Sequence, residues 1–216
     1  MITVTALGSA PPFVQGLVRD LRVRWALEEA GLRYQARLVS REDQASDAYR
    51  ALQPFGQVPA YEEDGLRLFE SGAIVMHIAE RSPALAPADP EGRARMTTWM
   101  FAALTSIEPW LAPLVELEFN AGQDWARQRG SALFEAARTR LGALAAWLDG
   151  RDYLEDRFTA ADLLMSTVLR IPRHTDLVAQ FPALDAYHRR CEARPAFQKA
   201  LADQMADFAR PTPAGG

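Results

Sequence analysis

The chain has 216 residues, of which 49% are apolar and 24% are charged, as in an ordinary globular protein with a well-buried core. Its net charge is −4, and its arginines are mixed with acids, so no basic field indicates a nucleic-acid or anionic-membrane partner. One cysteine, Cys191, excludes an internal disulfide framework, and three scattered histidines offer little for a metal site, so we expect no metal.

The N-terminal segment lacks the charged region and long apolar core of a signal peptide. No apolar run approaches the length of a membrane span, so we expect no membrane partner and a cytoplasmic location. Cys191 stands in a charged helical pattern far from the N-terminal region in sequence, and we interpret it as a packing residue rather than a nucleophile.

In chain order, the first part alternates between strand and helix patterns. Apolar residues at helical spacing predict a first helix that begins near Val14 and ends at Gly31, and Asp64-Gly65 predicts a hairpin turn. The expected order is strand, helix, strand, helix, strand, strand, helix, over the segments ITVTAL, VQGLVRDLRVRWALEEA, YQARLVS, REDQASDAYRAL, VPAYEE, LRLFE and SGAIVMHIAER. This order implies a βαβ unit and a ββα unit that share one mixed sheet.

A Pro- and Ala-rich stretch then separates two kinds of sequence. Beyond it almost every pattern is helical. We therefore predict an α+β first domain at residues 1–82, a linker at 83–92 and an all-helical second domain at 93–216.

The stretch QPFGQVPAY places a proline inside an extended segment. A cis Val58–Pro59 bond would turn the N–H and C=O of Val58 outward, where they could pair with an extended peptide as an added strand. The alternative is that Pro59 simply ends a strand.

The next stretch, LFESG, places Glu70 and Ser71 where a strand gives way to a helix. The N–H and hydroxyl of Ser71 at the positive end of the helix dipole would suit a carboxylate, and Glu70 would suit an ammonium group. The alternative is that Ser71 is an N-cap and Glu70 a solvated acid. Together with the Val58 edge, the pattern matches a small zwitterionic peptide.

These stretches resemble the cytosolic glutathione transferases, of a bacterial type. QPFGQVPAY followed by LFESGAIVMHIAER is similar to their glutathione-binding half, and RVRWALEEAGLRYQ is similar to their first helix and second strand. FTAADLLMSTVLR and FPALDAYHRRCEARPAFQKAL are similar to segments of their helical domain. The resemblance implies a thioredoxin-like N-terminal domain, an all-α C-terminal domain, glutathione as co-substrate and a homodimer.

The resemblance also implies a role for each matching residue. Val58 would pair with the cysteinyl part of glutathione, and Pro59 would be the cis proline. Glu70 would hold the γ-glutamyl ammonium and Ser71 its carboxylate. Two further residues would lie near the peptide, namely Gln57 alongside it and Gln44 at the glycyl carboxylate.

The second half offers one structural motif and one set of aromatic residues. Thr159 with Asp162 three residues later forms a capping box, which we assign to folding of the second domain. Four aromatic side chains either belong to the core or line the wall of an acceptor pocket: Trp99, Phe101, Trp110 and Phe119.

The group that activates the thiol is not evident from the pattern. In the resembled family a Tyr, Ser or Cys serves near the start of the first helix, but here that position falls near Gly16-Leu17. Ser9 is the only hydroxyl in the connection and is our candidate. If the helix starts at Pro11-Pro12, Ser9 lies just before it; if it starts near Gly16, helix amides or Gln15 would face the sulfur.

We therefore expect a glutathione transferase that joins the thiol of glutathione to largely apolar electrophiles, in a detoxification role. Two alternatives stay open. One is a glutathione-binding module of the same fold without catalytic activity, and the other is a glutathione-dependent isomerase or peroxidase.

Overall fold

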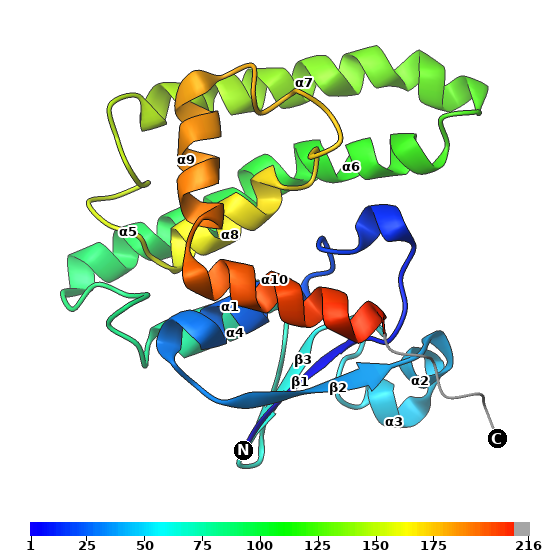
Figure 1. The fold of residues 1–216 in the computed structure, drawn as a ribbon, viewed down its shortest axis with the longest axis vertical. Coiled ribbons are helices and arrows are strands. Elements are labelled where there is room, and N and C mark those ends of the chain that lie inside the picture. Colours follow the sequence, from blue (N-terminus) through cyan, green and yellow to red (C-terminus); the bar gives the residue numbers. More distant parts are fainter. Residues whose placement is uncertain (210–216) are drawn as a thin grey trace. The chain divides into compact units, whose positions relative to one another are not determined.

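The computed structural model describes residues 1–209. It divides into two compact units (Figure 1). The first consists of Met1–Leu85 together with the C-terminal segment from Arg194, and the second is Ala86–Ala193. No helix within residues 1–209 is long and apolar enough to cross a membrane.

The first unit is built on a four-stranded mixed sheet with the order β2-β1-β3-β4. β1 is parallel to β2 and antiparallel to β3, and β3 and β4 form an antiparallel hairpin. The strands are β1 (Ile2–Leu7), β2 (Tyr34–Val39), β3 (Ala60–Glu63) and β4 (Leu66–Phe69). The predicted Asp-Gly turn is confirmed, because Asp64 and Gly65 both have positive φ, at 48° and 89°.

Helices cover this sheet, and α1 and α4 pack against each other (Figure 1). The helical segments of the unit are η1 (Pro12–Val14), α1 (Asp20–Ala30), α2 (Arg41–Ala45), α3 (Asp47–Arg50), α4 (Ser71–Ala79) and α10 (Pro195–Phe208). The predicted end of α1 at Gly31 is confirmed, with φ of 66°. Its predicted start near Val14 is wrong, because the chain makes one 3₁₀ turn and further turns before Asp20.

The second unit is helical throughout its regular structure. Its elements are α5 (Pro90–Phe101), the π-helical η2 (Ala102–Ile107), α6 (Glu108–Phe119), α7 (Asp124–Leu148), α8 (Ala160–Leu169) and α9 (Pro182–Glu192). Every residue of α8 is buried, and the predicted capping box at its start is confirmed. Asp162 accepts from the Thr159 N–H, and it also accepts from the Leu154 N–H and the Tyr187 hydroxyl. The box therefore anchors a neighbouring loop and α9 as well as α8.

The compact units differ from the expected division at 1–82, 83–92 and 93–216, since the first break falls between Leu85 and Ala86 and the second unit ends at Ala193. We assigned the last helix to the second domain, but α10 belongs to the first unit. It packs against α1 through an edge-to-face contact between Trp25 and Phe197, whose ring centroids are 4.8 Å apart. An ion pair between Arg24 and Asp207 joins the same two helices. The sequence pattern does not reveal this, because both contacts link residues from opposite ends of the chain.

Candidate active site

The segment before β3 presents an open backbone edge. The Val58–Pro59 peptide bond is cis, as predicted, and Pro59 is buried at the start of the strand. Within residues 1–209, neither the N–H nor the C=O of Val58 takes part in a hydrogen bond. Because these two groups are unpaired and Val58 is only half-buried, they form an edge to which an extended peptide can pair.

A buried glutamine shapes the loop that leads to this edge. Gln53 is 2% exposed, and its Oε1 accepts from the N–H of Phe55 at 2.7 Å and of Gln57 at 3.1 Å. Gln53 therefore holds the loop at two backbone amides, a role that was not predicted from the sequence. In the sequence, Gln53 stands out only as a glutamine before a proline, and this pair is too common to predict such a role.

Two buried hydroxyls connect the loop to β1. Tyr49 donates to the carbonyl oxygen of Gln57 at 2.8 Å, so its only proton is occupied. The Thr5 hydroxyl, 2.8 Å from Tyr49 Oη, is therefore the donor in that pair, and Thr5 in turn accepts from the Ala60 N–H at 2.7 Å. Burial raises the pKa of Tyr49, which keeps this donor protonated. The chain of bonds fixes the backbone on both sides of Val58–Pro59.

The second part of the site is the N-terminus of α4. Glu70 is the N-cap, with φ of 69°, a conformation that is uncommon outside glycine, and its exposed side chain makes no capping bond. Ser71 is the first helical residue, so the alternative that Ser71 is the N-cap is wrong. Its N–H and hydroxyl remain at the positive end of the helix, an arrangement that favours an anion.

A buried cation supports this end of α4. Arg22 of α1 is 4% exposed, and its Nη1 donates to Ser71 Oγ at 3.3 Å. Because the hydroxyl accepts this bond, its own proton is left for a second acceptor. Arg22 was not predicted from the sequence, where the available signal was an arginine between the apolar residues Leu21 and Val23. We call Arg22, Ser71 and the start of α4 the anion cradle.

The two glutamines expected near the peptide differ in their surroundings. Gln57 is exposed and directly precedes Val58. Gln44 Nε2 donates to the Ser40 carbonyl within α2, so this side chain is occupied locally. The backbone of Gln44 nevertheless lies against the loop, since a Cβ at Gly56 would come within 2.9 Å of the Gln44 carbonyl oxygen. α2 therefore borders the edge, although the structure does not bring the Gln44 side chain to it.

The chain between β1 and α1, residues 8–19, is called here the first connection. Ser9 is exposed there, directly after β1. α1 begins at Asp20 and not at either expected start, Pro11-Pro12 or near Gly16; only the short 3₁₀ helix η1 begins at Pro12. Gln15 is the side chain that was expected to face the sulfur if the helix started near Gly16. Its Nε2 instead donates to the Ala10 carbonyl at 2.9 Å, within the first connection.

In the second unit, the four aromatic residues do not gather around one cavity. Trp99 packs on Trp147 with ring centroids 5.1 Å apart and donates to Glu155, whereas Trp110 lies under the Arg140 guanidinium. Phe101 and Phe119 are exposed. A cavity of about 310 Å³ is instead lined mostly by other apolar residues, among them Leu114, Leu117, Phe134 and Ile171, with Glu118 and His174.

The remaining predictions concern cysteine and metal. Cys191 is fully buried in α9, which confirms the packing role. Among residues 1–209 there is no group of three or more His, Cys, Asp and Glu side chains that could hold a metal ion.

Comparisons with known proteins give the same family for both halves of the chain. The family model described as "Glutathione S-transferase, N-terminal domain" matches residues 15–80, and the model described as "Glutathione S-transferase, C-terminal domain" matches residues 126–195. Ser9 lies outside the first match, whereas Val58, Pro59, Glu70 and Ser71 lie within it.

Individual relatives cover most of the chain. A maleylacetoacetate isomerase of Rhizobium meliloti is 32% identical over 200 residues, which are 85% of this chain and 91% of the relative. A glutathione S-transferase of Hyoscyamus muticus is 29% identical over 195 residues, covering 84% and 92%. A glutathione transferase structure from Pseudomonas putida, with glutathione disulfide bound, matches with a TM-score of 0.78 and 26% identity, covering 93% of this chain and 90% of that one.

Proposed function

The chain belongs to the glutathione S-transferase family, and from that premise we propose that it conjugates the thiol of glutathione to electrophilic, largely apolar small molecules. The observation that carries the proposal is the pair of recognition elements in the first unit. These are the unpaired backbone edge at Val58 and the anion cradle at Ser71 and Arg22. A peptide with a free carboxylate at one end suits both.

The family resemblance suggests each proposed contact, and the geometry of the first unit is compatible with it. The N–H and C=O of Val58 pair with the cysteinyl backbone of glutathione, next to the cis Pro59. The γ-glutamyl carboxylate accepts from Ser71, and the exposed Glu70 carboxylate pairs with the ammonium group. Gln57 lies alongside the peptide. Gln44 would reach the glycyl carboxylate only by giving up its bond to the Ser40 carbonyl.

The reaction requires a thiolate near neutral pH, whereas a free thiol has a pKa of about 8.5. The sulfur forms a bond to the electrophilic carbon. The leaving group departs with its electron pair, or in an unsaturated acceptor the π electrons move to the next carbon, which takes a proton. We keep Ser9 as the candidate donor to the thiolate, because it is the only side-chain hydroxyl in the first connection and is exposed. A Ser9→Ala variant that reacts at the normal rate would exclude it.

The acceptor is proposed to bind in the second unit. The cavity lined by Leu114, Leu117, Phe134 and Ile171 is mainly apolar, which suits a hydrophobic electrophile. Leu114→Trp should fill part of it and raise KM for the acceptor while leaving KM for glutathione unchanged. If the KM for the acceptor, like the KM for glutathione, is the same in the variant as in the wild type, the assignment of the acceptor to this cavity is contradicted.

A second candidate is a glutathione-dependent isomerase, favoured by the 32% identity to a maleylacetoacetate isomerase. The thiolate would add to a double bond and be eliminated after rotation, so glutathione would be regenerated rather than consumed. A peroxidase on the same site is a further variant. Incubation with a cis unsaturated diketo acid separates isomerisation, which leaves the thiol concentration constant, from conjugation, which lowers it.

The main test combines binding and turnover. Calorimetry should show glutathione binding, and a generic aryl halide should consume thiol. Binding without turnover of any acceptor would favour a binding module that has lost catalysis. Ser71→Ala should weaken glutathione binding by about 2 kcal/mol, because a charge-assisted hydrogen bond is lost. Unchanged affinity in that variant would contradict the carboxylate contact.

We also propose a homodimer, a cytoplasmic location and a role in detoxification. The homodimer is supported by an exposed aromatic pair in the first unit. Phe55 is 68% and Phe69 is 38% exposed, with ring centroids 6.2 Å apart. Sedimentation should give twice the chain mass, and Phe55→Ser should shift the protein toward the monomer. A wild-type chain that sediments as a monomer would overturn this part of the proposal.

A further inference from the structure

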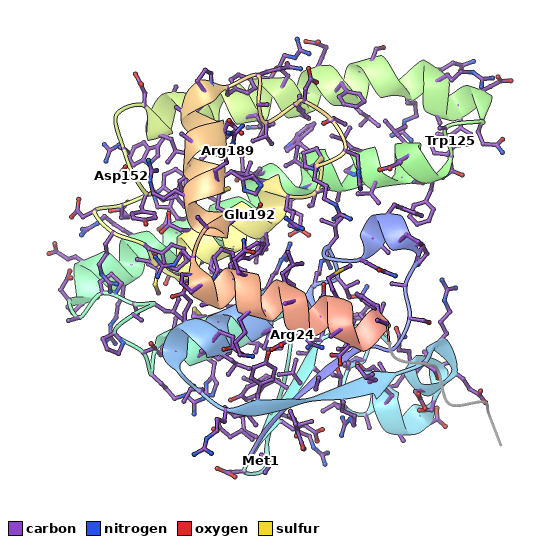
Figure 2. All side chains as sticks on the ribbon, viewed as in Figure 1. Met1, Arg24, Trp125, Asp152, Arg189 and Glu192 are labelled. Atoms are coloured by element: carbon purple, nitrogen blue, oxygen red, sulfur yellow. The ribbon has the colours of Figure 1, made fainter. Side chains whose placement is uncertain are left out.

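Helix α10 carries two buried polar side chains, Gln204 and Asp207, which are 1% and 4% exposed. Gln204 contacts the first residue of α1, Asp20, and Asp207 contacts Arg24 one turn further along the helix. Figure 2 labels Arg24 on α1, whose Nη2 donates to Asp207 Oδ2 at 2.6 Å. The Nε of Arg24 donates to Asp20 Oδ2 at 2.7 Å. The first residue of α1 is thus joined to the C-terminal helix through a buried ion-pair chain.

Gln204 makes three hydrogen bonds to the segment that enters α1. Its Oε1 accepts from the N–H of Gly16 at 3.1 Å. Its Nε2 donates to the carbonyl of Val18 at 3.1 Å and to Asp20 Oδ1 at 2.7 Å. A reversed amide would place its NH₂ against an N–H and its oxygen against two acceptors, so only one orientation satisfies these partners.

These bonds determine which amides of the turn remain available. The N–H of Gly16 is taken by Gln204, and the N–H of Leu17 donates to the Val14 carbonyl at 2.9 Å. Within residues 1–209, the Val18 N–H has no hydrogen-bond partner. Gly16 has φ of 78°, which suits glycine, so the turn depends on both this residue and the Gln204 amide.

The position of this turn relates it to the proposed glutathione site. β1 and β3 are antiparallel with Val4 opposite Tyr61, so the end of β1 lies beside the Val58 edge. The first connection starts there and leads into α1, where Arg22 touches Ser71. The first connection therefore runs between the two ends of the proposed peptide site, where the cysteinyl sulfur would lie.

We propose that Gln204 is a positioning residue for thiol activation, which acts through the turn at residues 16–18 rather than by touching glutathione. This inference rests on the proposed function. Gln204 holds the backbone of the first connection at two points and fixes the start of α1 at a third. The donor that meets the sulfur, whether a side chain or the Val18 amide, is carried by this backbone.

The test measures the pKa of the bound glutathione thiol from the ultraviolet absorbance of the thiolate across a pH series. Gln204→Met keeps a similar shape and removes all three bonds. We expect the bound thiol pKa to rise by about one unit, which reduces the thiolate fraction and kcat about tenfold below the pKa. KM for glutathione should stay unchanged, because Val58 and Ser71 are not altered.

Two matched variants separate positioning from stability. Phe197→Leu loosens the contact with Trp25 between the same helices without touching the turn, and should lower Tm without changing the thiol pKa. Gln198→Met alters an exposed glutamine of α10 and should change neither.

If Gln204→Met lowers Tm but leaves the thiol pKa and kcat at wild-type values, like Phe197→Leu, the positioning role is overturned while the proposed function stands. If the wild-type protein forms no thiolate with glutathione, the proposed function and this inference both fail.

Discussion

Two buried aspartates, one in each unit, hold the starts of helices in different ways. Asp162 accepts from neutral donors, namely two backbone N–H groups and the hydroxyls of Thr159 and Tyr187. Asp20 instead accepts from the Arg24 guanidinium and from Gln204, which is 184 residues away in sequence. Both are 0% exposed, and burial raises the pKa of both carboxyls, for Asp20 to about 6.

The two aspartates differ in how far away their hydrogen-bond partners lie in the sequence, and in which part of the molecule those partners stabilise. The partners of Asp162 lie within 25 residues, and they stabilise α8 and its neighbours. The partners of Asp20 join the two ends of the chain beside the first connection. We therefore expect changes around Asp162 to alter stability alone, and changes around Asp20 to alter stability and, through the turn at residues 16–18, the thiol.

The largest expected effect is that of Arg24→Met. It removes the buried guanidinium that pairs with both Asp20 and Asp207, which should lower the free energy of unfolding by about 3–5 kcal/mol. Urea denaturation measures this loss. Arg189→Met, which breaks an exposed i,i+4 pair with Asp185, is the matched control and should cost less than about 1 kcal/mol. Equal losses in the two variants would contradict a stabilising role for the buried ion-pair chain.

The features predicted from sequence are those with local causes. The hairpin at Asp64-Gly65, the end of α1 at Gly31 and the capping box of Asp162 each depend on residues a few positions apart. The cis bond before Pro59 was also expected, from the pattern around it and the family resemblance.

The missed features depend on contacts across the fold. Arg22 reaches Ser71 from another helix, and Gln204 reaches the first connection from the last helix. The placement of α10 with the first unit was missed for the same reason. A single arginine or glutamine inside a helical pattern does not reveal its partner, because solvated surface residues give the same pattern.

The next effect concerns pH. The pKa of Asp20 rises from an ordinary 3.8 to about 6 on folding, so between these values the folded state holds a proton that the unfolded state has lost. This group's contribution to stability therefore falls as pH rises from about 4 to about 6, by about 3 kcal/mol in total. The difference in unfolding free energy between wild type and Asp20→Asn should decrease by that amount over this range. Parallel pH profiles for the two proteins would contradict it.

A smaller effect is expected for Asp162→Asn. The amide keeps one oxygen for the Leu154 and Tyr187 donors but turns an NH₂ group toward the Thr159 N–H. We expect a loss of about 2 kcal/mol in the free energy of unfolding, because a buried donor loses its acceptor. Thermal unfolding of the full chain measures it. Asp185→Asn, at a partly exposed carboxyl, should leave the transition nearly unchanged.

The smallest effect on the free energy of unfolding is expected for Tyr187→Phe. Tyr187→Phe removes one donor from Asp162 and leaves the Leu154 and Thr159 N–H bonds in place, so it should cost about 1 kcal/mol. Gln204→Met likewise removes a donor from Asp20 and should have a comparable effect on stability through that bond. Only the Gln204 variant should raise the pKa of bound glutathione, since only Asp20 shares its partner with the first connection. If the thiol pKa shifts equally in both variants, the thiol responds to general destabilisation of the fold. The functional distinction between the two aspartates would then be wrong.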